Sequence, residues 1–387
     1  MSRTPALIVG GGPAGATLAL RLAQAGLPHL LVERTRETGD ALCGGFLSWR
    51  TLAALERIGI AGDRLNRATL SHVRLFAGGV VAEARLPQPG RCVSRRRLDR
   101  LLLAAAERAG ARVERGAGVR SIEGRTARLE DGALLTGEAL FLASGKSDVR
   151  GLARPAAARG ADPTIGLRVR LSPAAALDRS IGGAVELHLL DRGYGGLSLM
   201  EDGTANLCMA VHRSRLREAG GLEPLLLALA AESPALGERL AYRASGSPID
   251  AIANVPYGWR ATESLTGLFR LGDQAAVIPS IAGEGMGIAI ASAMAAGDAY
   301  VRQGAAGAET FQAGFAAQAR RPIAVAAAVW HMAERPAVAQ AALRLARTAP
   351  PLVALLARMT RIDGPRPDVR PPPDEVAIGG WNPRIAR

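Results

Sequence analysis

The sequence predicts an α/β protein in which a parallel sheet with a β-meander is joined to an antiparallel sheet and to C-terminal helices. The chain opens with a short apolar strand, a glycine-rich turn, a helix and a second apolar strand, the order of a parallel βαβ unit. Apolar and polar residues alternate in segments between residues 164 and 257, which is typical of antiparallel strands. After residue 300 the chain is rich in Ala and Leu at helical spacing.

Length and composition limit the class of protein. A chain of 387 residues is long enough for two or three domains. Because 48% of the residues are hydrophobic and 21% are charged, global disorder is excluded. The three cysteines, Cys43, Cys92 and Cys208, are too few for a disulfide framework and fit a reduced, cytoplasmic compartment. We find no metal-ligand spacing, and we expect no metal.

The formal net charge is +13, and it comes almost entirely from arginine, because Lys146 is the only lysine. One interpretation is a compositional bias of the genome. The other is an anionic partner: the phosphates of a cofactor, an anionic lipid or an acidic substrate. Aromatic residues make up only 4% of the chain and no nucleic-acid-binding motif is visible, so we expect no nucleic-acid partner.

The glycines that follow the first strand have the spacing of a dinucleotide-binding turn. Residues 6–10 form the predicted strand, and Gly10, Gly12 and Gly15 follow in the pattern GxGxxG, with Pro13 and Ala14 opening a helix. Gly10 permits a tight turn, Gly12 lets the backbone approach a pyrophosphate, and Gly15 lets the helix pack closely on the strand. The N-terminus of the helix adds N–H groups and a positive dipole end.

The second strand, residues 29–33, ends on Glu33, whose carboxylate would accept hydrogen bonds from ribose hydroxyls. A carboxylate at this position disfavours a 2′-phosphate, so the site should hold FAD or NAD rather than NADP. Arg34, the next residue, joins the candidate cofactor-binding residues. This part of a Rossmann-type unit does not choose between FAD and NAD.

A second motif near residue 273 makes that choice. Residues 268–272 form a predicted strand, Asp273 follows, and glycines at 283–287 open an Ala-rich helix that continues to residue 299. The segment resembles the second FAD fingerprint of the superfamily of geranylgeranyl reductases and group A flavoprotein monooxygenases, which are p-hydroxybenzoate hydroxylase-like. The resemblance implies that the aspartate binds the ribityl chain and that the helix start lies against the flavin pyrimidine edge. It assigns to the FAD site Gly272, Asp273, Pro279, Gly283, Gly285, Met286 and Gly287.

Two further segments resemble the same superfamily. One of them is Val93-x-Arg95-x-x-Leu98-Asp99. The resemblance implies that Arg95 reaches the cofactor, although the neighbouring arginines leave that choice open. Residues 139–150 resemble the middle motif, which is linked to FAD and to the nicotinamide cofactor, but Ser144 stands where an aspartate is common. Between them, residues 112–141 contain short strands and two turn signals, which predicts the β-meander.

The segment after the second strand points to a branch of the superfamily. Cys43 and Gly44 match a Cys-Gly motif that geranylgeranyl reductase-like proteins carry near the isoalloxazine. Cys43 is therefore either a flavin-side residue or a small buried hydrophobe. Halogenation is not expected, because Lys146 is not at the halogenase position and residues 193–199 contain neither Trp nor Pro. Tyr194 is all that remains there of the aromatic motif of the reductases.

The predicted domains follow from these segments. Residues 1–163 and 258–300 form a discontinuous FAD-binding domain, and residues 164–257 form the antiparallel-sheet substrate domain. His188, Tyr194 and His212 are candidate polar groups of its pocket, or solvent-facing strand residues. Residues 301–362 form a helical region, and residues 363–387 a Pro-rich extended tail. The helices either pack against the substrate domain or offer an apolar channel and a basic, membrane-facing surface.

The expected function is that of an FAD-dependent oxidoreductase with NAD(P)H as a transient reductant. We expect a monooxygenase-like enzyme that hydroxylates or oxidises a hydrophobic aromatic or polyketide-type compound of secondary metabolism. One alternative is reduction of C=C bonds in a lipophilic substrate, as in geranylgeranyl reductases, and another is a non-catalytic FAD-binding module. Cys43 and Tyr194 are the candidates nearest the flavin, no catalytic base is identified, and NADH or NADPH, the substrate and the oligomeric state stay open.

Overall fold

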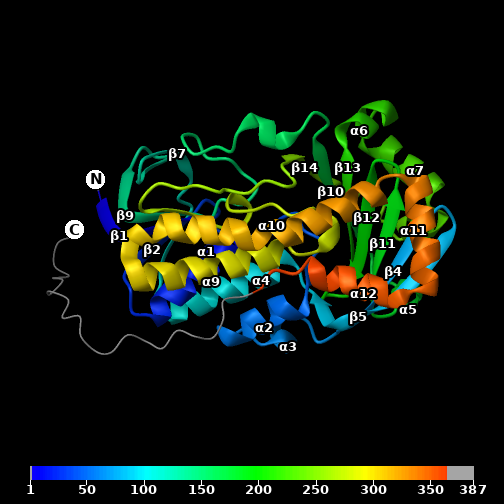
Figure 1. Cartoon of the computed structure of the whole chain (residues 1–387), viewed down its shortest axis with the longest axis horizontal. Helices are drawn as coiled ribbons and strands as arrows, with labels where there is room; N and C mark the ends of the chain where they lie inside the picture. Colours follow the sequence, from blue (N-terminus) through cyan, green and yellow to red (C-terminus); the bar gives the residue numbers. More distant parts are fainter. Residues whose placement is uncertain (1, 364–387) are drawn as a thin grey trace.

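The computed structural model describes residues 2–363, so the predicted tail lies almost entirely outside the described residues. The chain forms two sheets at opposite ends of the long axis of the molecule (Figure 1). The first sheet has seven strands, in the order β6 (Arg112–Arg115), β2 (His29–Glu33), β1 (Ser2–Val9), β9 (Leu134–Leu142), β8 (Thr126–Leu129) and β7 (Val119–Glu123), with β15 (Leu268–Arg270) also paired to β9.

The first sheet combines a parallel part with an antiparallel meander. β1 pairs in parallel with β2 on one side and with β9 on the other, which brings Val9 beside both Val32 and Leu142. β7, β8 and β9 are antiparallel neighbours in sequence order. Their turns place Gly124 at φ +57° and Gly132 at φ +90°, a backbone region that glycine adopts without strain. The predicted parallel sheet and β-meander are confirmed.

The second sheet has eight strands, and most of its pairs are antiparallel. Their order is β14 (Asp250–Val255), β10 (Thr164–Leu171), β13 (Ala205–His212), β12 (Gly193–Leu199), β11 (Ala184–Leu190), β4 (Leu70–Ala77), β5 (Val80–Cys92) and β3 (Phe46–Leu47). Strands β10 to β14 come from residues 164–257, whereas β3 to β5 come from residues 46–92, which we had assigned to the FAD-binding domain. β4 and β11 pair in parallel although they are more than a hundred residues apart, and local sequence patterns carry no signal for such a pair.

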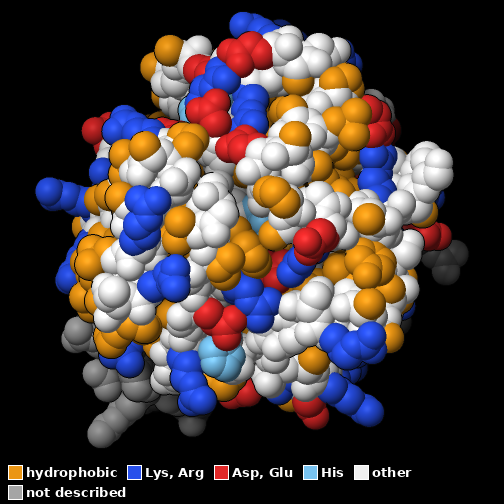
Figure 2. Space-filling model, turned by 90° about the vertical axis from the view of Figure 1, so that its right-hand side faces the viewer, with side chains coloured by type: hydrophobic (Ala, Val, Ile, Leu, Met, Phe, Trp, Pro, Cys, Tyr) orange, Lys and Arg blue, Asp and Glu red, His pale blue; other side chains and the backbone are white. Residues whose placement is uncertain are grey.

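Three helices close the described chain: α10 (Gly307–Ala333), α11 (Pro336–Thr348) and α12 (Pro350–Met359). α10 spans the distance between the two sheets, and α11 and α12 pack on the β4–β5 side of the second sheet (Figure 1). α10 continues through Pro322, which removes one backbone hydrogen bond, because buried residues such as Phe315 and Trp330 anchor it on both sides. On the face that Figure 2 shows, exposed apolar side chains lie among arginines. Within residues 2–363 we find no helix that is both long and apolar enough to cross a membrane.

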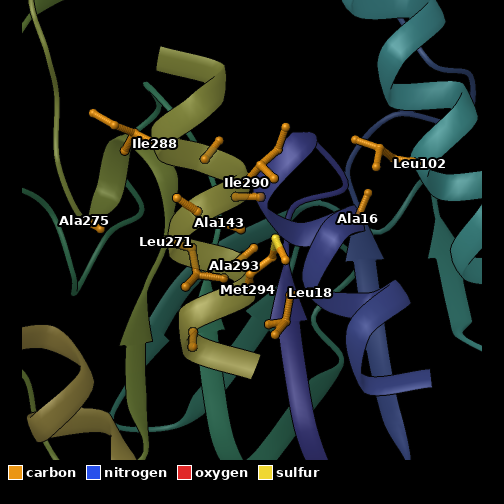
Figure 3. Packing of buried hydrophobic residues seen from close by; sticks show 14 of the residues in the cluster. Ala16, Leu18, Leu102, Ala143, Leu271, Ala275, Ile288, Ile290, Ala293 and Met294 are labelled. Atoms are coloured by element: carbon orange, nitrogen blue, oxygen red, sulfur yellow. The ribbon is translucent and has the colours of Figure 1, made fainter. Parts of the chain in front are cut away.

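The core of the first half lies between the sheet and three helices, α1 (Pro13–Gln24), α4 (Arg95–Arg108) and α9 (Gly285–Gln303). Figure 3 shows Leu18 of α1 pointing toward Ala293 and Met294 of α9. Small residues let these helices approach, since a Cβ on Gly297 would lie 2.9 Å from the Cγ of Arg21. The remaining α-helices are α2 (Trp49–Arg57), α3 (Gly62–Leu65), α5 (Ala175–Ile181), α6 (Arg213–Ala219), α7 (Leu222–Glu232) and α8 (Pro234–Leu240).

Candidate active site

A single large cavity of about 1010 Å³ connects the two halves of the molecule. At one end it is lined by the glycine turn after β1 and by the carboxyl end of β2. At the other end it lies between the second sheet and the C-terminal helices, where its walls are mainly apolar. This wall is formed by Leu75, Val185, Leu187, Leu189, Leu343, Leu352 and Leu356, among others. We call the two ends the glycine end and the apolar end.

The turn at the glycine end requires glycine. Gly10 has φ +104°, and a Cβ there would lie 2.6 Å from the carbonyl oxygen of Ala143. A Cβ on Gly15 would lie 1.8 Å from the carbonyl oxygen of Gly10, so any larger residue would push α1 away from β1. Gly12 and Pro13 begin α1 without a side-chain cap, which leaves the first N–H groups of the helix free for an anion. Gly15 itself lies behind the cavity wall.

Glu33 holds the carboxyl end of β2 against this turn. Its Oε2 accepts a hydrogen bond of 2.6 Å from the Gly11 amide, and its Oε1 accepts bonds of 2.9 and 2.8 Å from the amide and the hydroxyl of Thr35. The carboxylate is therefore fixed in position on the cavity wall, and Arg34 lines the wall beside it. A fixed carboxylate at the end of the second strand suits a ribose hydroxyl, which donates to it.

Arg95 lies at the first turn of α4 and reaches the glycine turn. Its Nη2 is 3.2 Å from the position of a Cβ on Gly12, and its guanidinium bonds the Asp99 carboxylate at 2.9 and 2.8 Å. Burial opposes its charge, but the Asp99 carboxylate raises the pKa of Arg95 above its ordinary value, so the side chain is a cation. Arg96 and Arg97 are exposed, and the Nε of Arg97 donates to the Arg64 carbonyl. The geometry therefore singles out Arg95.

The second glycine motif faces the first across the cavity. Gly272 has φ +56°, and a Cβ there would lie 3.3 Å from the Cβ of Ala14. Asp273, in the 3₁₀ helix η2 (Gly272–Gln274), lines the cavity 3.8 Å from the ammonium group of Lys146. Three more residues of the motif, Gly283, Gly285 and Met286, also line it.

Two residues of this motif lie outside the cavity lining. Pro279 is buried just before the 3₁₀ helix η3 (Ser280–Ala282). A Cβ on Gly287 would lie 2.5 Å from Oε1 of Glu284 and 2.8 Å from Oγ1 of Thr51. Gly287 therefore allows α9 to pack closely on α2. The resemblance assigns Gly287 to the cofactor site, but in the structure it does not line the cavity.

The residues at the glycine end fit FAD. Two glycine turns leave space that any Cβ would fill, a helix N-terminus offers free N–H groups, and Arg95 offers a buried cation for a diphosphate. Glu33 and Asp273 offer carboxylates for the hydroxyl groups of a ribose and of a ribityl chain. In residues 2–363 we find no group of His, Cys, Asp or Glu that could hold a metal ion.

Cys43 and Gly44 lie on the cavity wall, between the two ends. The Sγ of Cys43 accepts a hydrogen bond of 3.5 Å from the Gly45 amide, and its carbonyl accepts one of 2.9 Å from Asn206. Among the described residues no basic side chain forms a hydrogen bond with this sulfur, and the two bonds hold Cys43 in place on the wall.

Tyr194 lies on the wall of the apolar end. Its hydroxyl donates a hydrogen bond of 2.8 Å to Ser280, and Tyr257 bonds the same serine. Burial raises the pKa of Tyr194 well above 10 and the pKa of Tyr257 to about 12, so both phenols keep their protons at neutral pH. Trp330 packs edge-on against both rings, at centroid distances of 5.8 and 5.7 Å.

His188 and His212 lie outside the cavity wall. His188 is buried on the opposite face of β11, where it stacks on Phe76 with ring centroids 4.5 Å apart and bonds Ser233 at 3.2 Å. His212 bonds Glu334 at 2.8 Å in a separate hollow. Of the three residues named as pocket candidates or solvent-facing strand residues, only Tyr194 lies on the cavity wall, and the buried His188 fits neither description.

The structure also contains a buried ion pair, between Arg361 and Glu284, that the sequence did not indicate. Arg361 follows α12, and its guanidinium bonds the carboxylate of Glu284 and the carbonyls of Ala282 and Gly283. Its guanidinium carbon lies 5.8 and 5.7 Å from the ring centroids of Phe46 and Trp49. Arg361 therefore fixes the second glycine motif to the C-terminal helices. A lone arginine far from any motif gives no signal in the sequence. Tyr257 and Ser280 were not singled out either, whereas Lys146 lies in the segment that resembles the middle motif.

Part of the chain matches a known domain family, and the whole fold is similar to solved structures. Residues 3–138 match the family described as FAD binding domain. A menaquinone reductase of Mycolicibacterium smegmatis is 34% identical over 89 residues, which are 23% of this chain and 21% of that protein. The match thus spans about a fifth of the length of that relative.

Two solved structures share the fold over most of their length. A probable FAD-dependent monooxygenase from Pseudomonas aeruginosa, pqsL, has a TM-score of 0.67 at 19% identity and covers 89% of this chain and 100% of its own. A geranylgeranyl bacteriochlorophyll reductase-like protein from Thermoplasma acidophilum has a TM-score of 0.68 at 20% identity and covers 94% of each chain.

Together with the cavity, these findings define the class of the N-terminal part: residues 3–138 form an FAD-binding domain. More narrowly, the chain shares its fold with a probable FAD-dependent monooxygenase and with a geranylgeranyl bacteriochlorophyll reductase-like protein, one from each branch of the predicted superfamily. The matched domain supports the predicted cofactor FAD.

Proposed function

We propose that the protein is a monooxygenase-like enzyme that uses FAD and NAD(P)H to hydroxylate or oxidise a hydrophobic aromatic or polyketide-type metabolite. The observation that carries this proposal is the continuity of the cavity, which joins the glycine end to an apolar end between the second sheet and the C-terminal helices. A non-catalytic FAD-binding module has no need of a second compartment for an apolar ligand.

In this proposal the chain binds and positions, while bound FAD supplies the redox chemistry. The N-terminus of α1 and Arg95 hold the diphosphate, Glu33 holds the ribose, and Asp273 holds the ribityl chain. The apolar wall of β4, β11 and the C-terminal helices excludes water from the reacting atoms. Within residues 2–363 the two sheets leave no separate nicotinamide domain, so in this proposal NAD(P)H binds transiently at the protein surface.

In the proposed reaction one atom of dioxygen enters the substrate as a hydroxyl group and the other leaves as water. NAD(P)H supplies the two electrons that this balance requires, together with one proton from solvent. Reduction of a C=C bond is the second candidate, and the place of Cys43 on the cavity wall, where the reductase branch carries a Cys-Gly motif, favours it. That reaction would need no oxygen.

The test separates the two reactions. We would reduce the FAD-loaded protein anaerobically with NADH or NADPH, and then admit isotopically labelled dioxygen with and without 4-hexylphenol. We expect one labelled oxygen atom in the product for each NAD(P)H consumed. Oxidation of NAD(P)H to NAD(P)+ with reduction of dioxygen to hydrogen peroxide only, at a rate that the phenol does not change, would contradict the monooxygenase proposal. Reduction of lipophilic alkenes without oxygen would establish the alternative.

We also propose that α11 and α12 bring the apolar end to an anionic membrane surface from which a lipophilic substrate enters. The two helices contain Arg344, Arg347 and Arg358 and no Asp or Glu. Leu345 and Leu352 line the cavity and yet are 55% and 39% exposed. Exposed leucines among arginines suit the interface of an anionic bilayer.

Vesicle flotation tests the membrane proposal. We expect the protein to float with vesicles that contain phosphatidylglycerol and not with pure phosphatidylcholine vesicles. Replacing Leu345 and Leu352 by Ser should reduce flotation, whereas Ser at Leu227 and Leu265, which are 73% and 68% exposed elsewhere, should not. Equal flotation of both double variants would contradict the assignment to α11 and α12.

A further inference from the structure

Three hydroxyl groups from separate parts of the chain meet on the wall of the apolar end. Tyr194 comes from β12, Tyr257 follows β14, and Ser280 begins η3. The hydroxyl of Tyr194 donates to the Oγ of Ser280 at 2.8 Å, and the hydroxyl of Tyr257 shares a short hydrogen bond with the same atom. All three residues line the cavity. We call them the hydroxyl cluster.

The hydroxyl cluster contains one more hydrogen than its internal bonds use. Because both phenols stay protonated at neutral pH, the three hydroxyl groups carry three hydrogens. Two hydrogen bonds join them. If Tyr257 donates to Ser280, the spare hydrogen belongs to Ser280, and if Ser280 donates to Tyr257, it belongs to Tyr257. In either arrangement one O–H donor has no acceptor within the cluster.

The surroundings offer this donor no other acceptor among the hydrogen bonds of the described residues. The cluster lies against apolar residues of the sheet, of η3 and of the C-terminal helices, such as Leu189, Ile281 and Leu343. The aromatic contacts of Trp330 with both tyrosine rings keep the two phenols in place. Ser280 is exposed to the cavity, so water can bond this donor in the ligand-free protein. A ligand that displaces this water must bring an acceptor, or it leaves the donor unpaired.

The cluster is also next to the second glycine motif. Ser280 lies between Pro279 and Gly283, in the loop that the C-terminal Arg361 fixes. A ligand atom bound to the cluster is therefore placed beside the loop that the resemblance assigns to the flavin.

We propose that Tyr194, Tyr257 and Ser280 form an oxygen-recognition subsite that donates a hydrogen bond to a carbonyl or hydroxyl oxygen of the substrate. This inference rests on the proposed function, because it assumes that the apolar end takes the substrate. It narrows the substrate class from any hydrophobic molecule to one with an acceptor oxygen on the part that enters the cavity first. The subsite orients the substrate, and the oxygen marks the end that faces the flavin loop.

A matched pair of ligands and a matched pair of variants test the subsite without turnover. Heptanophenone and heptylbenzene have the same carbon skeleton and differ by one carbonyl oxygen. We would measure both dissociation constants by calorimetry on the FAD-loaded protein in the Tyr194→Phe/Tyr257→Phe variant and in the same variant with Ser280→Ala. In the first variant Ser280 keeps one free hydroxyl, and in the second the cluster has none.

We expect the added Ser280→Ala change to weaken ketone binding by at least about fivefold and to leave heptylbenzene binding unchanged, because only the ketone then buries an unpaired oxygen. Ser198→Ala removes another hydroxyl from the cavity wall, one that accepts a bond from Cys92, and should change neither ligand. Equal losses for both ligands, or no loss for the ketone, would overturn the subsite. Because the readout is binding, failure of hydroxylation alone would count against the proposed reaction and leave this result standing.

Discussion

The two ends of the cavity are built by different means. At the glycine end the wall is largely backbone from two short segments, where a Cβ on Gly10 or Gly283 would lie 2.6 or 2.9 Å from a neighbouring atom. At the apolar end the wall consists of side chains from the second sheet, the η3 loop and the C-terminal helices, which are far apart in the sequence. Under the proposed function, the comparison teaches that cofactor binding depends on local motifs, whereas the choice of substrate depends on tertiary packing. Single substitutions should therefore cause a large loss of FAD binding at the glycine end and smaller, graded changes in ligand binding at the apolar end.

The largest expected effect is at the glycine end. Gly12→Asp would put a carboxylate within reach of the Arg95 guanidinium, which lies 3.2 Å from the Cβ position, and would neutralise the cation meant for the diphosphate. We expect the purified variant to lose its yellow cofactor, with FAD affinity lower by at least about a hundredfold. Gly314→Asp is the control, because a Cβ on this exposed glycine of α10 meets nothing within 4 Å. Retention of stoichiometric FAD in Gly12→Asp would place the diphosphate elsewhere.

The second effect tests the connection between the two ends. Arg361→Ala would leave the Glu284 carboxylate, which is 1% exposed, buried without its cation. Removing one partner of a buried ion pair costs about 3–5 kcal/mol, and we expect that loss in the free energy of unfolding measured with urea. Arg358→Ala, in the exposed part of α12, should change it by less than about 0.5 kcal/mol. Similar values for the two variants would show that Arg361 does not hold the ends together.

The third effect concerns a buried carboxylate of the second sheet, on the face opposite the apolar end, and the pH dependence of stability that it predicts. Glu186 and His188 lie on the face of β11 opposite the cavity, and Glu186 bonds Arg74 and Arg239 at 3.0 and 3.1 Å. Burial alone would raise the pKa of Glu186, but His188 and Arg239 outweigh it and lower that pKa to about 2 from an ordinary value of 4.5. A lowered pKa stabilises the fold above pH 4.5, and this stability is lost as the pH falls toward 2.

The corresponding measurement is the free energy of unfolding against pH. We expect the wild type to lose about 3 kcal/mol through this carboxyl group on acidification, and Glu186→Gln to lack that part of the slope. Glu56→Gln, on the exposed face of α2, should keep the slope of the wild type. An unchanged slope in Glu186→Gln would mean that the carboxylate is not the group responsible.

The smallest effect again concerns the glycine end. Asp273→Ala removes a carboxylate that lies 3.8 Å from Lys146 and is partly exposed, so water can replace part of its contribution. We expect FAD affinity to fall by about tenfold, which corresponds to one charge-assisted hydrogen bond. Titration of the cofactor-free protein with FAD measures it, and an unchanged dissociation constant would remove Asp273 from the ribityl site.

The glycine end could be predicted from the sequence because its chemistry depends on local spacing. Gly10, Gly12 and Gly15 have a steric reason for being glycine that a linear pattern reveals. Arg95 could be placed only as one of three neighbouring arginines, since the side of α4 that faces the turn depends on packing. The β-meander followed from its turn residues, whereas the addition of β4 and β5 to the second sheet did not, because the parallel pairing of β4 with β11 is non-local.

The apolar end was harder to predict for the same reason. His188 and His212 alternate along strands just as Tyr194 does, and only the packing of α10 and the η3 loop decides which of them faces the cavity. Ser280 stood unnoticed inside the second glycine motif, because its partners Tyr194 and Tyr257 are 86 and 23 residues away. Arg361 needed the fold to bring it to Glu284, which is 77 residues earlier.

The central claim is that one cavity brings an apolar ligand to the flavin. The most direct measurement titrates the FAD-loaded protein with heptylbenzene while recording the heat of binding and the flavin absorption spectrum on the same samples. The account predicts that the flavin bands shift with the same saturation curve as the heat. Saturable heat with an unchanged flavin spectrum would contradict it, because the apolar ligand would then bind away from the cofactor.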